Sequence, residues 1–189
     1  MPRLANQLLA LLAVALLAAA CGSSDDSVGT ITLGNGSLTP DDVEAPQTDL
    51  ESLDPALRLP IADADGNEVA LTDYLGRPAV VNLWASWCAF CIAEMPEFEI
   101  VFQEVKDEIS FVGINIDADA DRELADQLAA ETGVTYDLLF DTSDQIGQRL
   151  GSIAMPATAF IDSAGEIINV HNGQLTEESL REMIDDLLS

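Results

Sequence analysis

The chain has 189 residues, enough for a leader and one domain of ordinary size. Its 34 acidic residues outnumber 7 lysines and arginines, and the formal net charge of −27 argues against a nucleic-acid partner. Three cysteines and the single His171 are too few, and too widely spaced, for a framework of structural disulfides or a closed zinc site, so we predict no metal.

Residues 1–20 are interpreted as a leader. The apolar run from Leu8 to Ala20 is too short to span a bilayer. The run ends in Leu-Ala-Ala-Ala-Cys-Gly, which resembles a bacterial lipoprotein signal and implies lipid attachment at Cys21. The alternative is a secretory cut after Ala20 that leaves a free thiol. Both interpretations place the protein outside the cytoplasm, in an oxidising compartment.

Residues 21–56 are rich in Gly, Ser, Asp, Thr and Pro and contain no Lys or Arg, which predicts an acidic, flexible tether. We expect the folded domain to comprise residues 57–189. Apolar and polar residues alternate over Leu57–Ile61, as in a strand. A segment with the composition of a turn follows at Asp63–Asn67, and apolar residues resume at Val69–Leu71. This pattern is typical of a β-hairpin.

Two cysteines lie where a predicted strand gives way to a predicted helix. Residues 79–83 are apolar and β-branched, as in a buried strand. The first turn of a helix carries unpaired N–H groups that stabilise a thiolate, so Cys88 should have a lowered pKa and act as a nucleophile. Cys91, one turn further on, can resolve a mixed disulfide. The helix is indicated by apolar residues at helical spacing: Phe98, Val101, Phe102, Val105 and Ile109.

The rest of the chain alternates between helical and extended patterns. In the helix predicted at 122–132, Leu124 and Leu128 are expected to face inward. The remaining predicted elements are a strand at 111–116, a helix at 122–132, a strand at 136–140, a helix at 146–150, an antiparallel pair at 153–162 and 167–170, and a closing helix at 176–188.

The run Trp84-Ala85-Ser86-Trp87-Cys88-x-x-Cys91 resembles the active site of the thioredoxin superfamily. Its extension to Pro96 resembles the TlpA/ResA-like (DsbE/CcmG-related) branch of membrane-tethered thiol-disulfide oxidoreductases. The resemblance implies an α/β thioredoxin fold of order βαβ…ββα. An N-terminal β-hairpin and a central helix/strand insert agree with that branch.

Glu94 lies three residues after Cys91, on the same face of the predicted helix. Burial beside the apolar seam should raise its pKa, and the resemblance assigns it the role of exchanging a proton with Cys91. Thioredoxin's own buried acid has no equivalent, because Asn82 occupies that strand position and cannot shuttle protons.

Met155-Pro156 matches the superfamily's cis-proline loop, which implies a cis bond and a Met155 backbone offered to a bound substrate strand. We expect Trp87 to line an apolar rim where substrate docks, and Trp84 to lie in the core. A surface or capping role is expected for His171.

The predicted function is extracytoplasmic thiol-disulfide exchange without a cofactor, because the Cys88–Cys91 pair carries the electrons. Ala89 and Phe90 add no charge that would stabilise the Cys88 thiolate, which favours a reductant. The resemblance suggests exported substrates such as apocytochrome c, a membrane electron donor and attachment to the bacterial cell membrane as a lipoprotein. We expect a monomer. The alternatives are a dithiol oxidase and a metal-handling module that uses the CxxC pair as ligands.

Overall fold

The computed structural model describes residues 51–117 and 122–189. The predicted leader, Cys21 and most of the predicted tether lie outside the described residues, so each stays a prediction. Over the described ranges, no helix combines the length and the apolar character needed to cross a bilayer.

Within the described residues, seven strands form one sheet in the order β2-β1-β5-β4-β3-β6-β7. Strand β3 is parallel to β4 and antiparallel to β6, and the central strand β4 is also parallel to β5. The bounds are β1 (Ile61–Ala62), β2 (Glu68–Val69), β3 (Ala79–Trp84), β4 (Ser110–Asn115), β5 (Asp137–Phe140), β6 (Ala157–Ile161) and β7 (Ile167–Asn172).

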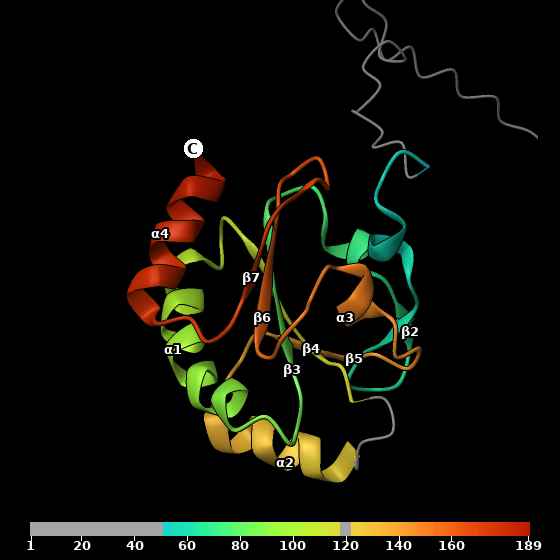
Figure 1. Cartoon of the computed structure of the whole chain (residues 1–189), viewed down its shortest axis with the longest axis vertical. Helices are drawn as coiled ribbons and strands as arrows, with labels where there is room; N and C mark the ends of the chain where they lie inside the picture. The colour runs from blue at the N-terminus through green and yellow to red at the C-terminus, as the bar shows by residue number, and fades with distance from the viewer. Residues whose placement is uncertain (1–50, 118–121) are drawn as a thin grey trace, which may run out of the picture. The chain divides into compact units, whose positions relative to one another are not determined.

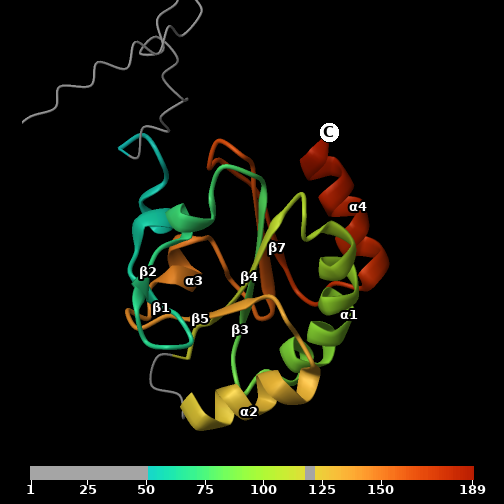
Figure 2. The same ribbon diagram turned by 180° about the vertical axis from the view of Figure 1, so that it is seen from behind.

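Helices cover both faces of the sheet (Figures 1 and 2). The bounds are α1 (Ala89–Val105), α2 (Arg122–Thr132), α3 (Ile146–Arg149) and α4 (Glu177–Leu188), with 3-10 helices η2 (Pro55–Arg58) and η3 (Leu71–Tyr74). Helices α1 and α4 lie side by side on one face, and α3 lies on the other face with the N-terminal segments. The units β3-α1-β4 and β6-β7-α4 follow the βαβ…ββα order that the sequence predicts, with α2, β5 and α3 as the insert.

Strand β3 is buried on both faces, and its side chains alternate between two cores. Val80 packs under α1 and α4, where Phe111 contacts the rings of Phe98, Phe102 and Tyr136 at centroid distances of 4.9–5.9 Å. Residues 81 and 83 pack on the opposite face, against the η2, η3 and α3 layer. This alternation places position 82 on the α1 face.

The predicted N-terminal hairpin is present, but it is shorter than expected. Residues 55–58 form η2 rather than a strand, because Pro55 starts a helical turn that the Asp54 carboxylate caps through the Ala56 N–H. Leu53 is already buried in the core, ahead of residue 57. The turn forms as predicted, with Asp63 Oδ1 accepting from the N–H groups of residues 65 and 67.

Two helix predictions were wrong in detail. Helix α1 ends at Val105, and Ile109 reaches the core from the loop that follows. Leu124 is 43% exposed, and α2 instead buries Ala125 and Ala129. These small side chains pack into the cluster around the cysteines, where they let α2 lie close to α1.

Candidate active site

The cysteines lie at the junction between β3 and α1. Cys88 is the N-cap of α1 and forms a disulfide with Cys91, whose N–H donates to Cys88 Sγ at 3.2 Å. Cys88 is 5% exposed and Cys91 is fully buried. Because free N–H groups and the helix dipole point at Cys88, its thiolate is favoured once the disulfide is reduced.

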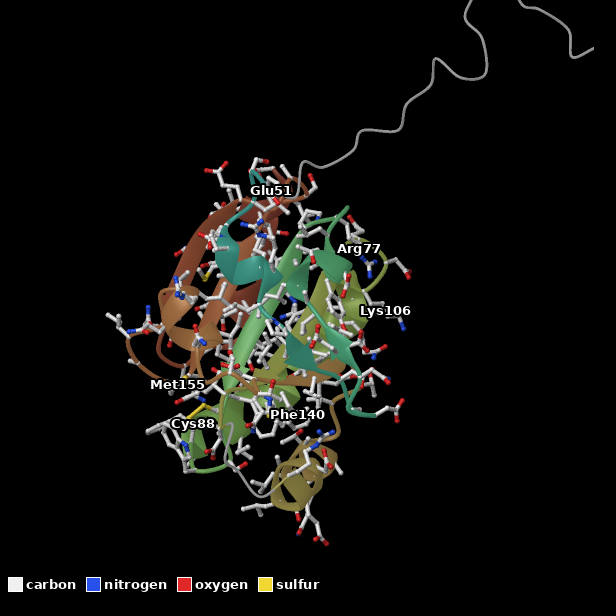
Figure 3. The ribbon with its side chains drawn as sticks, turned by 90° about the vertical axis from the view of Figure 1, so that its right-hand side faces the viewer. Glu51, Arg77, Cys88, Lys106, Phe140 and Met155 are labelled. Atoms are coloured by element: carbon white, nitrogen blue, oxygen red, sulfur yellow. A yellow bond between two sulfur atoms is a disulfide. The ribbon has the colours of Figure 1, made fainter. Side chains whose placement is uncertain are left out.

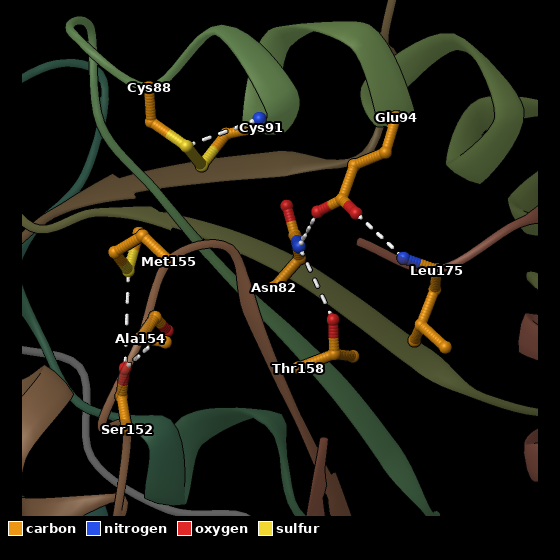
Figure 4. Close-up of a disulfide and its surroundings, with 9 residues drawn as sticks. All are labelled: Asn82, Cys88, Cys91, Glu94, Ser152, Ala154, Met155, Thr158 and Leu175. Atoms are coloured by element: carbon orange, nitrogen blue, oxygen red, sulfur yellow. Dashed lines mark hydrogen bonds between the residues drawn. A yellow bond between two sulfur atoms is a disulfide. The ribbon is translucent and has the colours of Figure 1, made fainter. Parts of the chain in front are cut away.

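The loop before β6 lies against this disulfide. The Met155–Pro156 peptide bond is cis, as the resemblance implies. Met155 packs against the cluster that contains both cysteines, and Figures 3 and 4 show it close to them. The loop residue just before Pro156 therefore faces the reactive pair.

Three large apolar side chains are exposed on the two segments that carry the disulfide and Met155. Trp87 is 67% exposed and Phe90 is 66% exposed, one on each side of Cys88 in the sequence. Ile153, in the loop that carries Met155, is 89% exposed. Trp84 is fully buried, as expected for a core residue. Large exposed apolar groups beside a reactive site are typical of a surface that binds polypeptide.

Glu94 is a fully buried carboxyl one turn along α1 from Cys91. Its Oε1 accepts from Asn82 Nδ2 at 2.9 Å, and its Oε2 accepts from the Leu175 N–H at 3.1 Å (Figure 4). Burial raises the pKa of Glu94 to about 7, and the nearby Glu97 adds to the rise, whereas the two hydrogen bonds oppose it. A carboxyl with this pKa exchanges protons near neutral pH.

The last residue of β7 and the short segment that follows it contact both the carboxyl and the cis-proline loop. Asn172 Oδ1 accepts from the N–H groups of Ile153 and Ala154 at 2.8 and 3.2 Å. The Gly173 N–H donates to the Pro156 carbonyl at 2.8 Å, and Leu175 bonds Glu94. The sequence does not predict these contacts, because a backbone donor and a distant amide leave no local pattern.

Metal-ligating side chains do not gather at this site. Across the part of the chain that the structure describes, no group of three or more His, Cys, Asp or Glu side chains could hold a metal ion. His171 lies on β7, opposite Thr158 of β6, and is partly exposed. The reactive groups that the structure gathers at this site are the cysteine pair and the Glu94 carboxyl.

The chain is similar to known proteins in sequence and in fold. The sequence pattern of the family described as Redoxin matches residues 45–187. The chain is 36% identical to "Thiol:disulfide interchange protein HelX" of Rhodobacter capsulatus over 147 residues, 77% of this chain and 76% of that protein. It is 28% identical to "Thiol-disulfide oxidoreductase ResA" of Geobacillus thermodenitrificans over 131 residues, 67% of this chain and 72% of that protein. The solved structure of MTB dsbF, in mixed oxidised and reduced forms, has 28% identity and a TM-score of 0.60, over 72% of this chain and 99% of that one.

Proposed function

Since the chain belongs to the Redoxin family and is a thiol-disulfide oxidoreductase, we propose that it reduces disulfides in exported proteins. The observation that carries the proposal is the asymmetry of the pair, with Cys88 at the helix N-terminus and Cys91 buried behind it. The apolar Ala89-Phe90 dipeptide between them supports a reductant, because oxidants of this class stabilise the reduced thiolate strongly.

In the proposed reaction the Cys88 thiolate attacks one sulfur of a substrate disulfide, and the second substrate sulfur leaves as a thiolate. The Cys91 sulfur then attacks Cys88 Sγ, forms the Cys88–Cys91 disulfide and releases the first substrate sulfur as a thiolate. Two electrons pass from the protein to the substrate. The cysteine pair carries them, so the protein residues supply the whole redox centre.

Glu94 is proposed to accept the proton of Cys91 as that sulfur attacks, and to return it when the pair is reduced again. Its position one turn from Cys91 and its pKa of about 7 support this role. Glu94 acts on a reacting sulfur, whereas Asn82 and Leu175 act only through Glu94.

The substrate is proposed to lie along Met155, with Trp87 contributing an apolar contact. The exposure of Trp87, Phe90 and Ile153 supports this surface. We propose that the leader 1–20 is cleaved and that Cys21 carries a lipid anchor. A tether over residues 21–56 would then hold the domain 57–189 beside the bacterial cell membrane. A disulfide of apocytochrome c as the substrate, and a membrane protein as the electron donor, fit that location.

The Asn172→Ala variant tests how far the cis-proline loop depends on its side-chain acceptor. We expect the reaction of Cys88 with a cystine-containing peptide to slow by about tenfold, because a loosened loop misplaces the substrate. The free energy of unfolding should fall by about 1 kcal/mol or less, since water replaces an exposed hydrogen bond. Stopped-flow fluorescence and urea unfolding measure the two effects.

Asn169→Ala, an exposed position on the same strand, is the matched control for Asn172→Ala. It should leave the rate unchanged. Equal rates in the two variants would show that Asn172 does not position the loop.

The direction of the reaction is tested by the redox equilibrium of the Cys88–Cys91 pair in glutathione and thioredoxin buffers. A potential of about −270 mV, near that of thioredoxin, is the expected result and identifies a reductant. A potential of about −120 mV, near that of DsbA, would reject reduction and identify a dithiol oxidase.

A further inference from the structure

Asn82 is a polar side chain in the middle of β3, a strand that is buried at every position. It is fully buried, and its neighbours along β3 are apolar. Thr158 of β6 lies directly opposite, and Gly113 of β4 lies opposite on the other side. Opposed residues share one face, so Asn82 and Thr158 both face α1 and Glu94. A buried amide in such a place is costly unless its hydrogen bonds are made.

The hydrogen bonds of Asn82 use only one end of the amide. Nδ2 donates to Glu94 Oε1 at 2.9 Å and lies 3.4 Å from Thr158 Oγ1, as Figure 4 shows. Oδ1 is buried and has no partner among residues 51–117 and 122–189. The donor end of the amide is therefore hydrogen-bonded, and the acceptor end has no partner among the described residues.

Glu94 changes its hydrogen-bonding character when it takes up a proton. A carboxylate only accepts, whereas a carboxylic acid also donates. An amide has a donor end and an acceptor end, and the Thr158 hydroxyl both donates and accepts. If the Asn82 amide turns about its Cβ–Cγ bond, Oδ1 can accept from the acid and from Thr158 together. In either orientation one end of the amide has no hydrogen-bond partner among the described residues. The two orientations therefore differ mainly in their bond to Glu94, and the protonation state of Glu94 selects between them.

We propose that Asn82 is a positioning residue that hydrogen-bonds Glu94 in both protonation states, donating to the carboxylate and accepting from the carboxylic acid. This inference rests on the proposed proton exchange between Glu94 and Cys91. It explains how Asn82, which cannot carry a proton itself, occupies the strand position beside the proton acceptor. The Glu94 carboxyl stays in one position when it gains or loses a proton, because the Leu175 N–H also bonds its other oxygen.

Other titratable groups face this site, and the experiment must separate them. Glu97 lies on α1, and Tyr136, whose pKa burial and the charge of Glu94 both raise, lies just before β5. His171 lies on β7, opposite Thr158. In the oxidised protein the two cysteines are joined in a disulfide and do not titrate.

The test is NMR of the full, oxidised chain between pH 5 and pH 9. The carboxyl carbon of Glu94 and the side-chain amide of Asn82 are followed together. We expect both signals to shift with one midpoint near the pKa of Glu94, about 7. In Glu94→Gln the Asn82 amide should become independent of pH, and in His171→Gln its titration should persist.

An Asn82 amide that stays unmoved while Glu94 titrates would overturn the inference and leave the role of Glu94 intact. A Glu94 signal that does not titrate over this range would overturn both the inference and the proposed proton exchange. The wild-type measurement alone gives this result, so it does not depend on a variant that folds.

Variants at Asn82 add a readout that packing alone would not move. Asn82→Leu keeps the branched shape and removes both amide ends. Because the bond to the carboxylate is the stronger of the two bonds lost, the pKa of Glu94 should rise by about one unit. Asn82→Asp keeps an acceptor, loses the donor and adds a second carboxyl, so the rise should be larger. Thr158→Val, the matched control, leaves the bond to Glu94 and should give a smaller shift. An unchanged pKa in Asn82→Leu would overturn the inference.

Discussion

In the Cys91→Ser variant, a covalent complex between Cys88 and a substrate cysteine should accumulate. Cys88 is the more exposed sulfur of the pair, at 5% against 0% for Cys91, so it still attacks a substrate disulfide, but no second sulfur remains to release the product. Turnover should fall by about a thousandfold or more. Mass spectrometry under non-reducing conditions identifies the trapped complex, and an insulin-reduction assay measures the turnover.

Cys88→Ser should lose the same turnover without forming a complex, since Cys91 is buried. Both variants are made in a Cys21→Ser background, which removes the remaining cysteine of the chain and should itself leave turnover unchanged. A complex that formed through Cys91 in Cys88→Ser would reverse the assignment of the two roles.

The pH dependence of stability should differ sharply between the wild type and Glu94→Gln. Burial raises the pKa of Glu94 from 4.5 to about 7 in the folded protein. Below about pH 4.5 the carboxyl is protonated in both the folded and unfolded states. Between about pH 4.5 and pH 7 the unfolded chain loses its proton first, so the wild type loses stability as pH rises. The loss should total about 3 kcal/mol, on the order of 1.4 kcal/mol per pKa unit.

Urea unfolding of the oxidised proteins at a series of pH values measures this difference. The wild-type curve should fall relative to Glu94→Gln across that window and then run parallel above it. Glu108→Gln, at an exposed position after α1, removes the same charge and serves as the control. Parallel curves for wild type and Glu94→Gln at all pH values would mean that Glu94 has no raised pKa.

The parts of this molecule that could be predicted are those with local patterns. The apolar run at 79–83 and the CxxC spacing locate β3, the start of α1 and the disulfide, and the offset from Cys91 places Glu94 one turn away. These features depend on neighbours within a few residues, so the sequence carries them directly.

The parts that could not be predicted depend on contacts between distant segments. Leucine is more apolar than alanine, yet α2 buries Ala125 and exposes Leu124, because the face of α2 that packs into the cysteine cluster is the one that carries Ala125 and Ala129. The hydrogen bond from the Leu175 N–H to Glu94 joins residues 81 positions apart. A backbone amide has no side-chain signature, so only the folded arrangement reveals it.

The segment from Asn172 to Leu175 has a practical consequence for protein engineering. Turns between a strand and a helix are common sites for inserting tags or reporter domains. Here an added residue would shift the partners of the cis-proline loop and of Glu94 together, through the bonds made by Asn172, Gly173 and Leu175. A reporter is better placed at the exposed Asp107 and Glu108, which leaves the active end of the domain untouched.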